Sequence, residues 1–474
     1  MTKGGQNVRA VVLAAGLGKR MKSELPKVLH PVLGKTILGR VLAALDGLNL
    51  EHIHIVVGHR ADDVQAYLES NPPQTSWSTH LQKPQLGTGH ALSMVAPALA
   101  TFKGTVLVAC GDTPLLTSDT LTNLLKAHQD GKAIVSLLTT VVPDAKSYGR
   151  IVRDNKGQIQ KIVEDKDASE KEKQIMEINP AIYCFAWPDI KPGLTGLKND
   201  NKQGEYYLTD LISWAVNEKH PMASAVAEDC KEVSGINSRI ELQEAGKILR
   251  DRVLTKLALD SGVTVVDPDS TWIAPEVTIG ADSTVLPGCF LEGDIVIGRN
   301  CLLGPHTTMN GVVKVGDGAS VIQSLVTDSE IGKHCKVGPF AHIRFNSFVG
   351  DETRIGNFVE LKKTTVGTKT NVSHLSYVGD ADIGDNANIG AGTITANYDH
   401  ITKTKNRTIV EDGASTGSNS VLVAPVRIGK EAVVAAGTVV TKDVPSETLA
   451  VGRVRQENKA DWVAYKKRKA AQKV

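Results

Sequence analysis

A repeating pair of one aliphatic residue and one glycine dominates the chain from about residue 279 to residue 440. Ile279–Gly280 and Ile297–Gly298 stand 18 residues apart, whereas Ile383–Gly384 and Ile389–Gly390 stand six apart. An α-helix would bring apolar residues back every three or four positions, so this period excludes one. It fits a short strand and a tight turn, with the aliphatic side chain inward and glycine where the backbone bends sharply. Three units would close a triangular coil, and stacked coils predict a parallel β-helix with a continuous aliphatic core.

A glycine-rich β-sandwich is the alternative explanation of this all-β pattern. The repeat, however, resembles that of the hexapeptide-repeat acyltransferases, whose fold is a left-handed parallel β-helix. We therefore expect that fold for residues 263–474, including a C-terminal basic tail.

Residues 1–240 show a different pattern, in which short apolar runs alternate with helical spacing. The runs Arg9–Leu13 and Thr105–Ala109 are typical of buried parallel strands. The alternation predicts a doubly wound, Rossmann-like α/β domain. Apolar residues from Arg239 to about Ser261 then fall at helical spacing, and we interpret 241–262 as a helical linker. A helix packed on the first domain is the alternative.

Composition narrows the class of protein. A chain of 474 residues exceeds what one core usually supports, and its net charge of +2 does not favour nucleic acid as a partner. No apolar run is long enough to span a membrane, and the first ten residues lack the apolar core of a signal peptide. The six cysteines show no CxxC spacing, which indicates reduced thiols rather than disulfides or a zinc site. We expect a cytoplasmic protein.

The segment after the first apolar run is a candidate phosphate-binding loop. It reads Gly16-Leu17-Gly18-Lys19-Arg20-Met21 and continues to Leu25-Pro26-Lys27. Glycines after a strand let backbone N–H groups approach phosphate oxygens, and Arg20 and Lys27 can neutralise a triphosphate. A bare Gly-x-Gly also occurs for structural reasons alone. The full string, with its arginine and Pro-Lys, resembles the signature of sugar-phosphate nucleotidylyltransferases.

Asp112 follows the second apolar run, and an aspartate at the carboxyl end of a strand is well placed to hold Mg²⁺ on phosphates. A helix cap or turn is the alternative role. The resemblance implies that Asn237 is the second metal ligand and that UTP is the donor. It also implies that UTP and UDP-N-acetylglucosamine bind to Leu13, Ala14, Ala15, Gly16, Lys27, Gln82, Gly87, Thr88, Cys110, Gly111, Asp112, Gly149, Glu164, Asn179 and Asn237.

Two interruptions of the six-residue repeat are candidates for function, because regular coils of a solenoid need none. One comprises Gly356–Lys363 and Ser373–Tyr377, and the other is a polar excursion over residues 396–407. A lone histidine is more often structural than catalytic. Lys362 and His374, however, are expected on neighbouring coils of one wall, together with Arg344, Tyr377 and Asn388. Cations there could hold a phosphate while neutral histidine accepts a proton from an attacking amine.

These segments resemble, over essentially the whole chain, the bacterial enzymes that are both glucosamine-1-phosphate N-acetyltransferase and N-acetylglucosamine-1-phosphate uridylyltransferase. The resemblance implies that His374 is the general base and that glucosamine-1-phosphate binds to Arg344, Lys362, Tyr377 and Asn388. It implies an acetyl-CoA site formed by Ala391, Asn397, Tyr398, Lys405, Ser418, Ala436 and Arg453, where Lys403 is the alternative to Lys405. It further implies a homotrimer and a product that feeds peptidoglycan and lipid A synthesis. The basic tail Trp462–Lys473 would belong to the trimer interface, or would form a solvated helix.

Three departures limit this transfer of roles. Phe345 replaces the usual proline after Arg344, Pro180-Ala181 replace the usual Thr-Gly after Asn179, and the loop after Tyr398 is slightly longer. Two rival functions are a nucleotidylyltransferase whose β-helix is only a scaffold and a regulatory protein without catalysis. The presence of His374 with Lys362 argues against the first, and the intact phosphate loop argues against the second.

Overall fold

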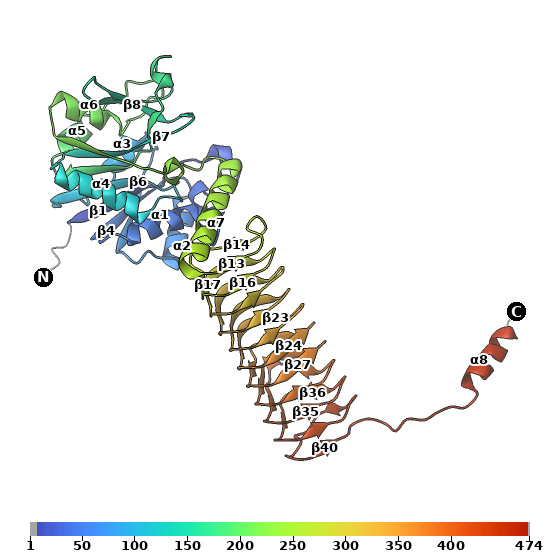
Figure 1. The fold of residues 1–474 in the computed structure, drawn as a ribbon. Coiled ribbons are helices and arrows are strands. Elements are labelled where there is room, and N and C mark those ends of the chain that lie inside the picture. Colours follow the sequence, from blue (N-terminus) through green and yellow to red (C-terminus); the bar gives the residue numbers. More distant parts are fainter. Residues whose placement is uncertain (1–6, 473–474) are drawn as a thin grey trace. The chain divides into compact units, whose positions relative to one another are not determined.

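The computed structural model describes residues 7–472 and divides the chain into two compact units, Met1–Leu249 and Arg250–Val474 (Figure 1). Lys473 of the predicted tail lies outside the described residues. The first unit is an α/β fold and the second is a solenoid of short parallel strands.

A ten-stranded mixed sheet forms the first unit, in the order β5-β4-β1-β6-β11-β7-β10-β8-β9, with β12 beside β7. β1 pairs in parallel with β4 and β6, whereas β11 pairs antiparallel with β6 and β7. The predicted doubly wound domain is therefore confirmed, with an antiparallel part added. The strands are β1 (Val8–Leu13), β4 (His52–Val57), β5 (Trp77–Leu81), β6 (Gly104–Cys110), β7 (Val135–Val141), β8 (Gly149–Arg153), β9 (Ile159–Val163), β10 (Glu177–Asn179), β11 (Tyr183–Trp187) and β12 (Met222–Val226), with a separate hairpin of β2 (Pro31–Val32) and β3 (Lys35–Thr36).

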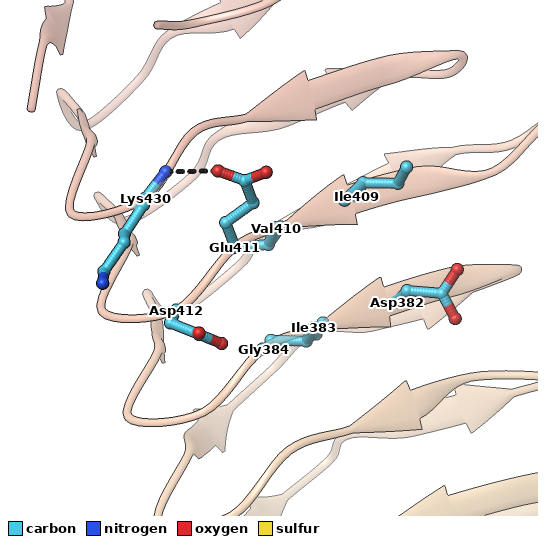
Figure 2. A pocket seen from close by; sticks show the side chains of 8 residues that line it. All are labelled: Asp382, Ile383, Gly384, Ile409, Val410, Glu411, Asp412 and Lys430. Carbon is cyan, nitrogen blue, oxygen red and sulfur yellow. Dashed lines mark hydrogen bonds between the residues drawn. The ribbon is translucent and has the colours of Figure 1, made fainter. Parts of the chain in front are cut away.

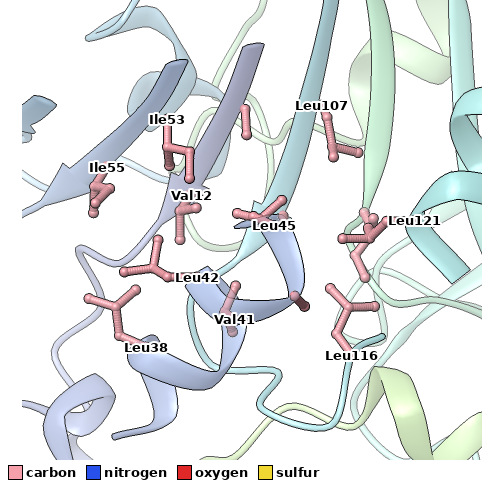
Figure 3. Packing of buried hydrophobic residues seen from close by; sticks show 14 of the residues in the cluster. Val12, Leu38, Val41, Leu42, Leu45, Ile53, Ile55, Leu107, Leu116 and Leu121 are labelled. Atoms are coloured by element: carbon pink, nitrogen blue, oxygen red, sulfur yellow. The ribbon is translucent and has the colours of Figure 1, made fainter. Parts of the chain in front are cut away.

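Both faces of this sheet are buried because successive side chains of a strand point to opposite sides. Val12 packs with Leu45 and Leu121, from α1 and α4, on one face (Figure 3). Val11 packs on the other face with Leu92 of α3. The helices are α1 (Ile37–Asp46), α2 (Ala61–Ser70), α3 (Thr88–Ser93), α4 (Ser118–Asp130), α5 (Lys191–Thr195) and α6 (Asp210–Asn217), and the 3₁₀ turns are η1 (Lys19–Met21), η2 (Lys27–Leu29), η3 (Glu172–Gln174) and η4 (Cys230–Val233).

Helix α7 (Arg239–Ser261) spans the range that the apolar spacing predicts. A capping box starts it, because Glu241 Oε2 accepts the backbone N–H groups of Asn237 at 2.6 Å and Ser238 at 2.9 Å. Its first half packs on the first unit through buried Ala245. The second unit begins inside the same helix at Arg250.

The second unit is the predicted parallel β-helix, with three faces. The first face contains β13 (Thr264–Val265), β16 (Thr284–Val285), β18 (Leu302–Leu303), β20 (Ser320–Val321), β22 (Lys336–Val337), β24 (Arg354–Asn357), β27 (Asn371–His374), β30 (Asn388–Ile389), β35 (Ser415–Thr416), β38 (Val433–Val434) and β40 (Leu449–Ala450). Four long strands bend across the second and third faces: β17 (Phe290–Ile297), β19 (Thr308–Val315), β21 (Leu325–Ile331) and β23 (His342–Val349). The second face adds β14 (Trp272–Ile273), β25 (Glu360–Lys362), β28 (Tyr377–Gly379), β31 (Ile394–Ala396), β36 (Val421–Val423) and β39 (Val439–Val440). The third adds β15 (Thr278–Ile279), β26 (Thr365–Val366), β29 (Ala381–Ile383), β34 (Thr408–Val410) and β37 (Val426–Ile428).

The aliphatic residue of each repeated pair points into the β-helix, as its period predicts. Ile279, Ile297, Ile331 and Ile383 are each at most 4% exposed. Equivalent residues stack in register from coil to coil, for example Ile279 on Ile297. The core is therefore one continuous aliphatic column.

The glycine of the pair has a different role from the one predicted. We define the aspartate corner as the turns between the third and first faces, where aspartates accept backbone N–H bonds from the preceding coil. Asp317 accepts the N–H of Arg299 at 2.8 Å, and Asp412 accepts that of Asp385 at 2.9 Å. A Cβ on Gly298 or Gly384 would collide with the aspartate of the next coil. These glycines thus allow close approach between coils, and their φ angles are not left-handed.

The C-terminal segment, residues 451–472, is exposed along its whole length. It ends in α8 (Trp462–Ala471), in which Lys466 lies 5.2 Å from the centre of the Trp462 ring. Within residues 7–472, no helix combines the length and apolar composition needed to cross a membrane.

Candidate active sites

A cavity of about 710 Å³ opens in the first unit at the carboxyl ends of β1 and β6. Parallel α/β sheets bind ligands at this edge. Nine of the residues predicted from the sequence line it: Leu13, Arg20, Thr88, Cys110, Asp112, Gly149, Glu164, Asn179 and Asn237. Burial raises the pKa of the Cys110 thiol to about 12, so it remains protonated and is no nucleophile.

The two predicted metal ligands converge on one point. Lys27 Nζ donates to Asp112 Oδ2 at 2.5 Å and to Asn237 Oδ1 at 3.1 Å. A carboxylate and an amide oxygen that both contact one cation are suitably placed for a divalent cation, and Mg²⁺ prefers such oxygen ligands. The side chains therefore fit Mg²⁺, and Lys27 lies beside them rather than in the wall of the cavity.

The predicted phosphate loop has room for a ligand on one side. A Cβ on Gly16 would meet nothing within 4 Å, whereas Gly18 has a φ of 59° and lies against the side chain of Lys27. Ala14 and Ala15 are buried beneath the loop, and Arg20 is exposed on η1. The loop at Gly16 can thus let an anion approach its backbone N–H groups, and Arg20 lines the cavity.

Three other predicted residues support the wall without lining it. Gln82 is buried, and its Nε2 donates to the carbonyl of Gly87 at 2.9 Å. Gly87 has a φ of 103°, and a side chain there would collide with Tyr206. Gly111 donates its N–H to the Leu13 carbonyl at 2.9 Å, which joins the ends of β1 and β6.

Glu164 and Asn179 are two polar residues of the cavity wall. Burial raises the pKa of the Glu164 carboxyl, and a hydrogen bond from Thr209 at 3.2 Å opposes that shift. Asn179 uses both ends of its amide, donating to the Tyr183 hydroxyl at 2.7 Å and accepting the N–H of Ala181 at 3.1 Å. The replacement by Pro180-Ala181 therefore leaves Asn179 fixed at the end of β10.

The predicted acetyl-transfer site lies in the β-helix. Its predicted base, His374, ends β27 at the corner between the first and second faces. We call this turn, with the equivalent turns of neighbouring coils, the base corner. His374 is exposed, and its Nδ1 lies 2.7 Å from Oδ1 of Asn357 on the preceding coil. An imidazole held through Nδ1 has its Nε2 free to act as a base.

The cationic corner lies at the other edge of the second face and consists of Arg344, Lys362, Asp380 and the excursion 397–407. Arg344 stacks in register on Lys362 and forms an ion pair with Glu360. The pKa of the Lys362 ammonium is lowered, mainly by desolvation and then by the positive charge of Lys405. An anionic ligand would relieve this repulsion, which is the expected behaviour of a phosphate site.

The excursion is a short hairpin of β32 (Tyr398–Asp399) and β33 (Thr404–Lys405), in which Tyr398 pairs with Lys405. Because Lys405 approaches Lys362, it is the lysine of the excursion that joins the cationic corner, whereas Lys403 lies in the turn. Buried Asn397 donates to Asp380 Oδ2 at 2.5 Å. The base of the hairpin is thus held on the preceding coil.

Four predicted acetyl-CoA residues lie on successive coils along the base corner: Ala391, Ser418, Ala436 and Arg453. Asn419 donates its N–H to the Ala391 carbonyl, Gly437 donates to that of Ser418, and Arg453 Nη1 donates to that of Ala436. The other three, Asn397, Tyr398 and Lys405, belong to the cationic corner. The second face, on which Tyr377 lies, separates the two groups.

The expectation of one wall needs a correction. Asn388 lies on the first face, where it pairs with Asn371, and His374 ends a strand of that same face, whereas Arg344, Lys362 and Tyr377 belong to the second face. Three partners of the predicted residues were not predicted from the sequence: Asn357 contacts His374, Glu360 contacts Arg344, and Asp380 contacts Asn397. A step of 16 or 17 residues separates the members of each pair. The length of one coil was therefore the signal that could have found these partners.

A hollow of about 420 Å³ in the β-helix lies at the aspartate corner and is lined by Asp382, Gly384, Asp412 and Lys430, among others (Figure 2). The backbone N–H of Lys430 donates to Glu411 there at 2.7 Å. No residue predicted to bind substrate lines this hollow.

Family models match both units. Residues 10–151 match the MobA-like NTP transferase domain, residues 276–311 match the bacterial transferase hexapeptide, and residues 407–442 match the hexapeptide repeat of succinyl-transferase. Fold and sites together define a transferase in which a nucleotidyltransferase precedes a hexapeptide-repeat acyltransferase.

Full-length relatives define the family. "Bifunctional protein GlmU" of Brevibacillus brevis is 45% identical, over 98% of this chain and 98% of that protein. Those of Exiguobacterium sibiricum and Synechococcus elongatus are 48% and 43% identical, over 96% of this chain and 99% and 98% of theirs. The chain belongs to the GlmU family of bifunctional proteins. It is a bifunctional enzyme, and the predicted pair of activities, acetyl transfer and uridylyl transfer, is confirmed over the scaffold and regulatory alternatives.

Proposed function

We propose that the two sites make UDP-N-acetylglucosamine in sequence, with the residue roles that follow. The observation that supports the roles is that one chain carries two separate sites of complementary chemistry. One is a cavity in which Asp112 and Asn237 converge, and the other is a strand face with a histidine at one edge and cations at the other.

In the acetyl transfer, glucosamine-1-phosphate lies across the second face. The phosphate binds Arg344 and Lys362, and Tyr377 and Asn388 complete the sugar site. The substrate nitrogen attacks the thioester carbon as the free amine, His374 Nε2 accepts the N–H proton that this nitrogen loses, and CoA leaves as its C–S bond breaks. Acetyl-CoA uses the column along the base corner and the hairpin of the cationic corner.

The second face is narrow enough for one ligand to reach both corners. Because a strand rises about 3.3 Å per residue, three-residue β28 spans roughly 10 Å, so long side chains at both edges can reach one small ligand.

In the uridylyl transfer, the phosphate of N-acetylglucosamine-1-phosphate attacks the α-phosphorus of UTP, and pyrophosphate leaves. Arg20 and Lys27 bind the triphosphate, the loop at Gly16 donates N–H groups, and Glu164 and Asn179 hold the sugar. Asp112 and Asn237 would hold Mg²⁺, which supplies positive charge to the phosphates. As UTP binds, Lys27 exchanges its two protein partners for phosphate oxygens.

The proposal includes a homotrimer and a cytoplasmic location. Support for assembly comes from the hexapeptide repeats and from the exposed segment 451–472, in which Val454, Trp462 and Tyr465 are exposed apolar side chains. The free state of all six cysteines supports a reducing compartment.

A single assay tests the reaction scheme. The full chain is supplied with glucosamine-1-phosphate, acetyl-CoA, UTP and Mg²⁺, and CoA and pyrophosphate are followed separately. We expect CoA without UTP, but pyrophosphate only after acetyl transfer or when N-acetylglucosamine-1-phosphate is added. Pyrophosphate formation from unacetylated glucosamine-1-phosphate at the full rate would contradict the order of the steps.

A further inference from the structure

Asn357 and His374 occupy the same position on successive coils of the β-helix. They pair in register as the last residues of β24 and β27, and each stands directly before a residue with left-handed φ, Phe358 at 56° and Leu375 at 50°. Neighbouring strands lie about 4.8 Å apart, so side chains at equivalent positions can meet directly. Here they form a hydrogen bond of 2.7 Å between Asn357 Oδ1 and His374 Nδ1.

The chemistry of this contact selects one tautomer of the imidazole. An amide oxygen only accepts hydrogen bonds, so Nδ1 must carry the hydrogen that it donates. The neutral ring then has its lone pair on Nε2, which is the atom that a base needs. The contact also fixes the direction of the ring, since the side chain has only two rotatable bonds.

We propose that Asn357 is a positioning residue that holds His374 in the Nδ1–H tautomer and aims Nε2 at the substrate amine. This inference rests on the proposed role of His374 as the general base. Asn357 itself touches neither substrate in this scheme, and within residues 7–472 its amide is the side-chain hydrogen-bond partner of the His374 ring.

An asparagine suits this position better than an aspartate would. A carboxylate beside the ring would favour the imidazolium and raise its pKa, whereas a neutral amide orients the ring without adding charge. On the strands that pair with β27, which are β24 and β30, the charged side chain is Arg354 on β24. Glu360 and Lys362 lie on β25, a strand of the second face. Residue 357 is thus a position at which the charge next to the base can be changed by one substitution.

Two variants of the full-length enzyme test the proposal. Asn357→Leu removes the acceptor, and the kcat for acetyl transfer should fall roughly 10- to 100-fold, a part of the 10²–10⁴-fold that a positioned base supplies. The KM for both substrates should stay within about twofold, because the phosphate and acetyl-CoA sites are intact. Asn357→Asp restores the acceptor, so its kcat should recover at high pH while the acid limb of the pH–rate profile moves to higher pH.

Asn310→Leu, on β19 of the same solenoid, is the matched control and should leave acetyl transfer unchanged. Uridylyl transfer, measured in every variant, reports whether the protein is folded. Normal kcat in Asn357→Leu, or an Asn357→Asp profile that coincides with the parent profile, would overturn the positioning role. His374→Ala decides the proposed function separately: if that variant is inactive while both Asn357 variants are normal, the base stands and only the positioning role fails.

Discussion

The Nζ atom of Lys27 lies 2.5 Å from Oδ2 of Asp112, although 85 residues separate them in the chain. The side chains are only 11% and 23% exposed, and Asn237 accepts from the same ammonium. A cation thus already lies where the two predicted metal ligands converge. Binding of a metal and a triphosphate must therefore move Lys27. Substitutions of Lys27 and of Asp112 can test this competition.

Replacing Asp112 by asparagine should separate the two activities. The change removes the carboxylate that would hold Mg²⁺, so pyrophosphate release should fall at least about 100-fold. CoA release should stay within about twofold of the parent enzyme, because the acetyl site belongs to the other unit. Parallel assays of both products check this expectation, and equal loss of both would contradict two independent sites.

Replacing Lys27 by methionine should lower kcat as well as affinity for UTP. The variant would lack the positive charge that stabilises the negative charge developing on the phosphates. Asp112 would also be left partly buried without its partner. Steady-state kinetics with varied UTP measures both effects, and Lys126→Met on α4 is an exposed control. A lower melting temperature with unchanged kinetics would show that Lys27 is only structural.

The pH dependence of uridylyl transfer should depend on Thr209. Burial raises the pKa of Glu164, and the Thr209 hydroxyl opposes this by donating to the ionised form. If the ionised carboxylate holds the sugar, kcat/KM for N-acetylglucosamine-1-phosphate falls as pH drops through that pKa. Thr209→Val removes the donor, so the pKa should rise further and the acid limb should move to higher pH. A profile that stays in place would remove Glu164 from the sugar site.

His374→Ala should lower the kcat of acetyl transfer by about 10²–10⁴-fold. Binding of glucosamine-1-phosphate should weaken far less, because its phosphate is assigned to Arg344 and Lys362. Steady-state assays of acetyl transfer measure kcat, and equilibrium binding measures the affinity for glucosamine-1-phosphate. His334→Asn, an exposed histidine with a φ of 55° at the aspartate corner, is the control and should behave as the parent. Near-normal turnover of His374→Ala would assign the base to another group.

Truncation after Val451 should weaken the trimer. Every residue from 452 to 472 is exposed, and Val454 is 93% exposed. Such a segment is expected to be covered by another copy. Sedimentation of the full chain and the truncated chain over a range of concentrations checks this. A truncated chain that remains trimeric at the lowest concentration would assign the tail to solvent.

The sequence predicted the fold of each unit because inward positions repeat with fixed periods. Ile279 and its equivalents mark one buried position per turn, and the apolar runs before Ala14 and Cys110 mark buried strands. Contacts between coils were harder to foresee, since they depend on which side chains stack. The bond between Asn357 and His374 and the aspartates that cover Gly298 and Gly384 became clear only from the register. The predicted limits at residues 240 and 263 stay predictions, because α7 begins before the first limit and ends at Ser261, just before the second.

The excursion of residues 397–407 shows what sets the position of a residue along the axis of the β-helix. At the aspartate corner the same contact joins Thr368 to Asp385 and Asp385 to Asp412, yet the first step is 17 residues and the second is 27. Both steps advance the ladder by one strand spacing, about 4.8 Å. Position along the axis is therefore counted in coils rather than in residues. A hairpin can therefore be inserted at a corner, as here, and every coil beyond it keeps its position along the axis.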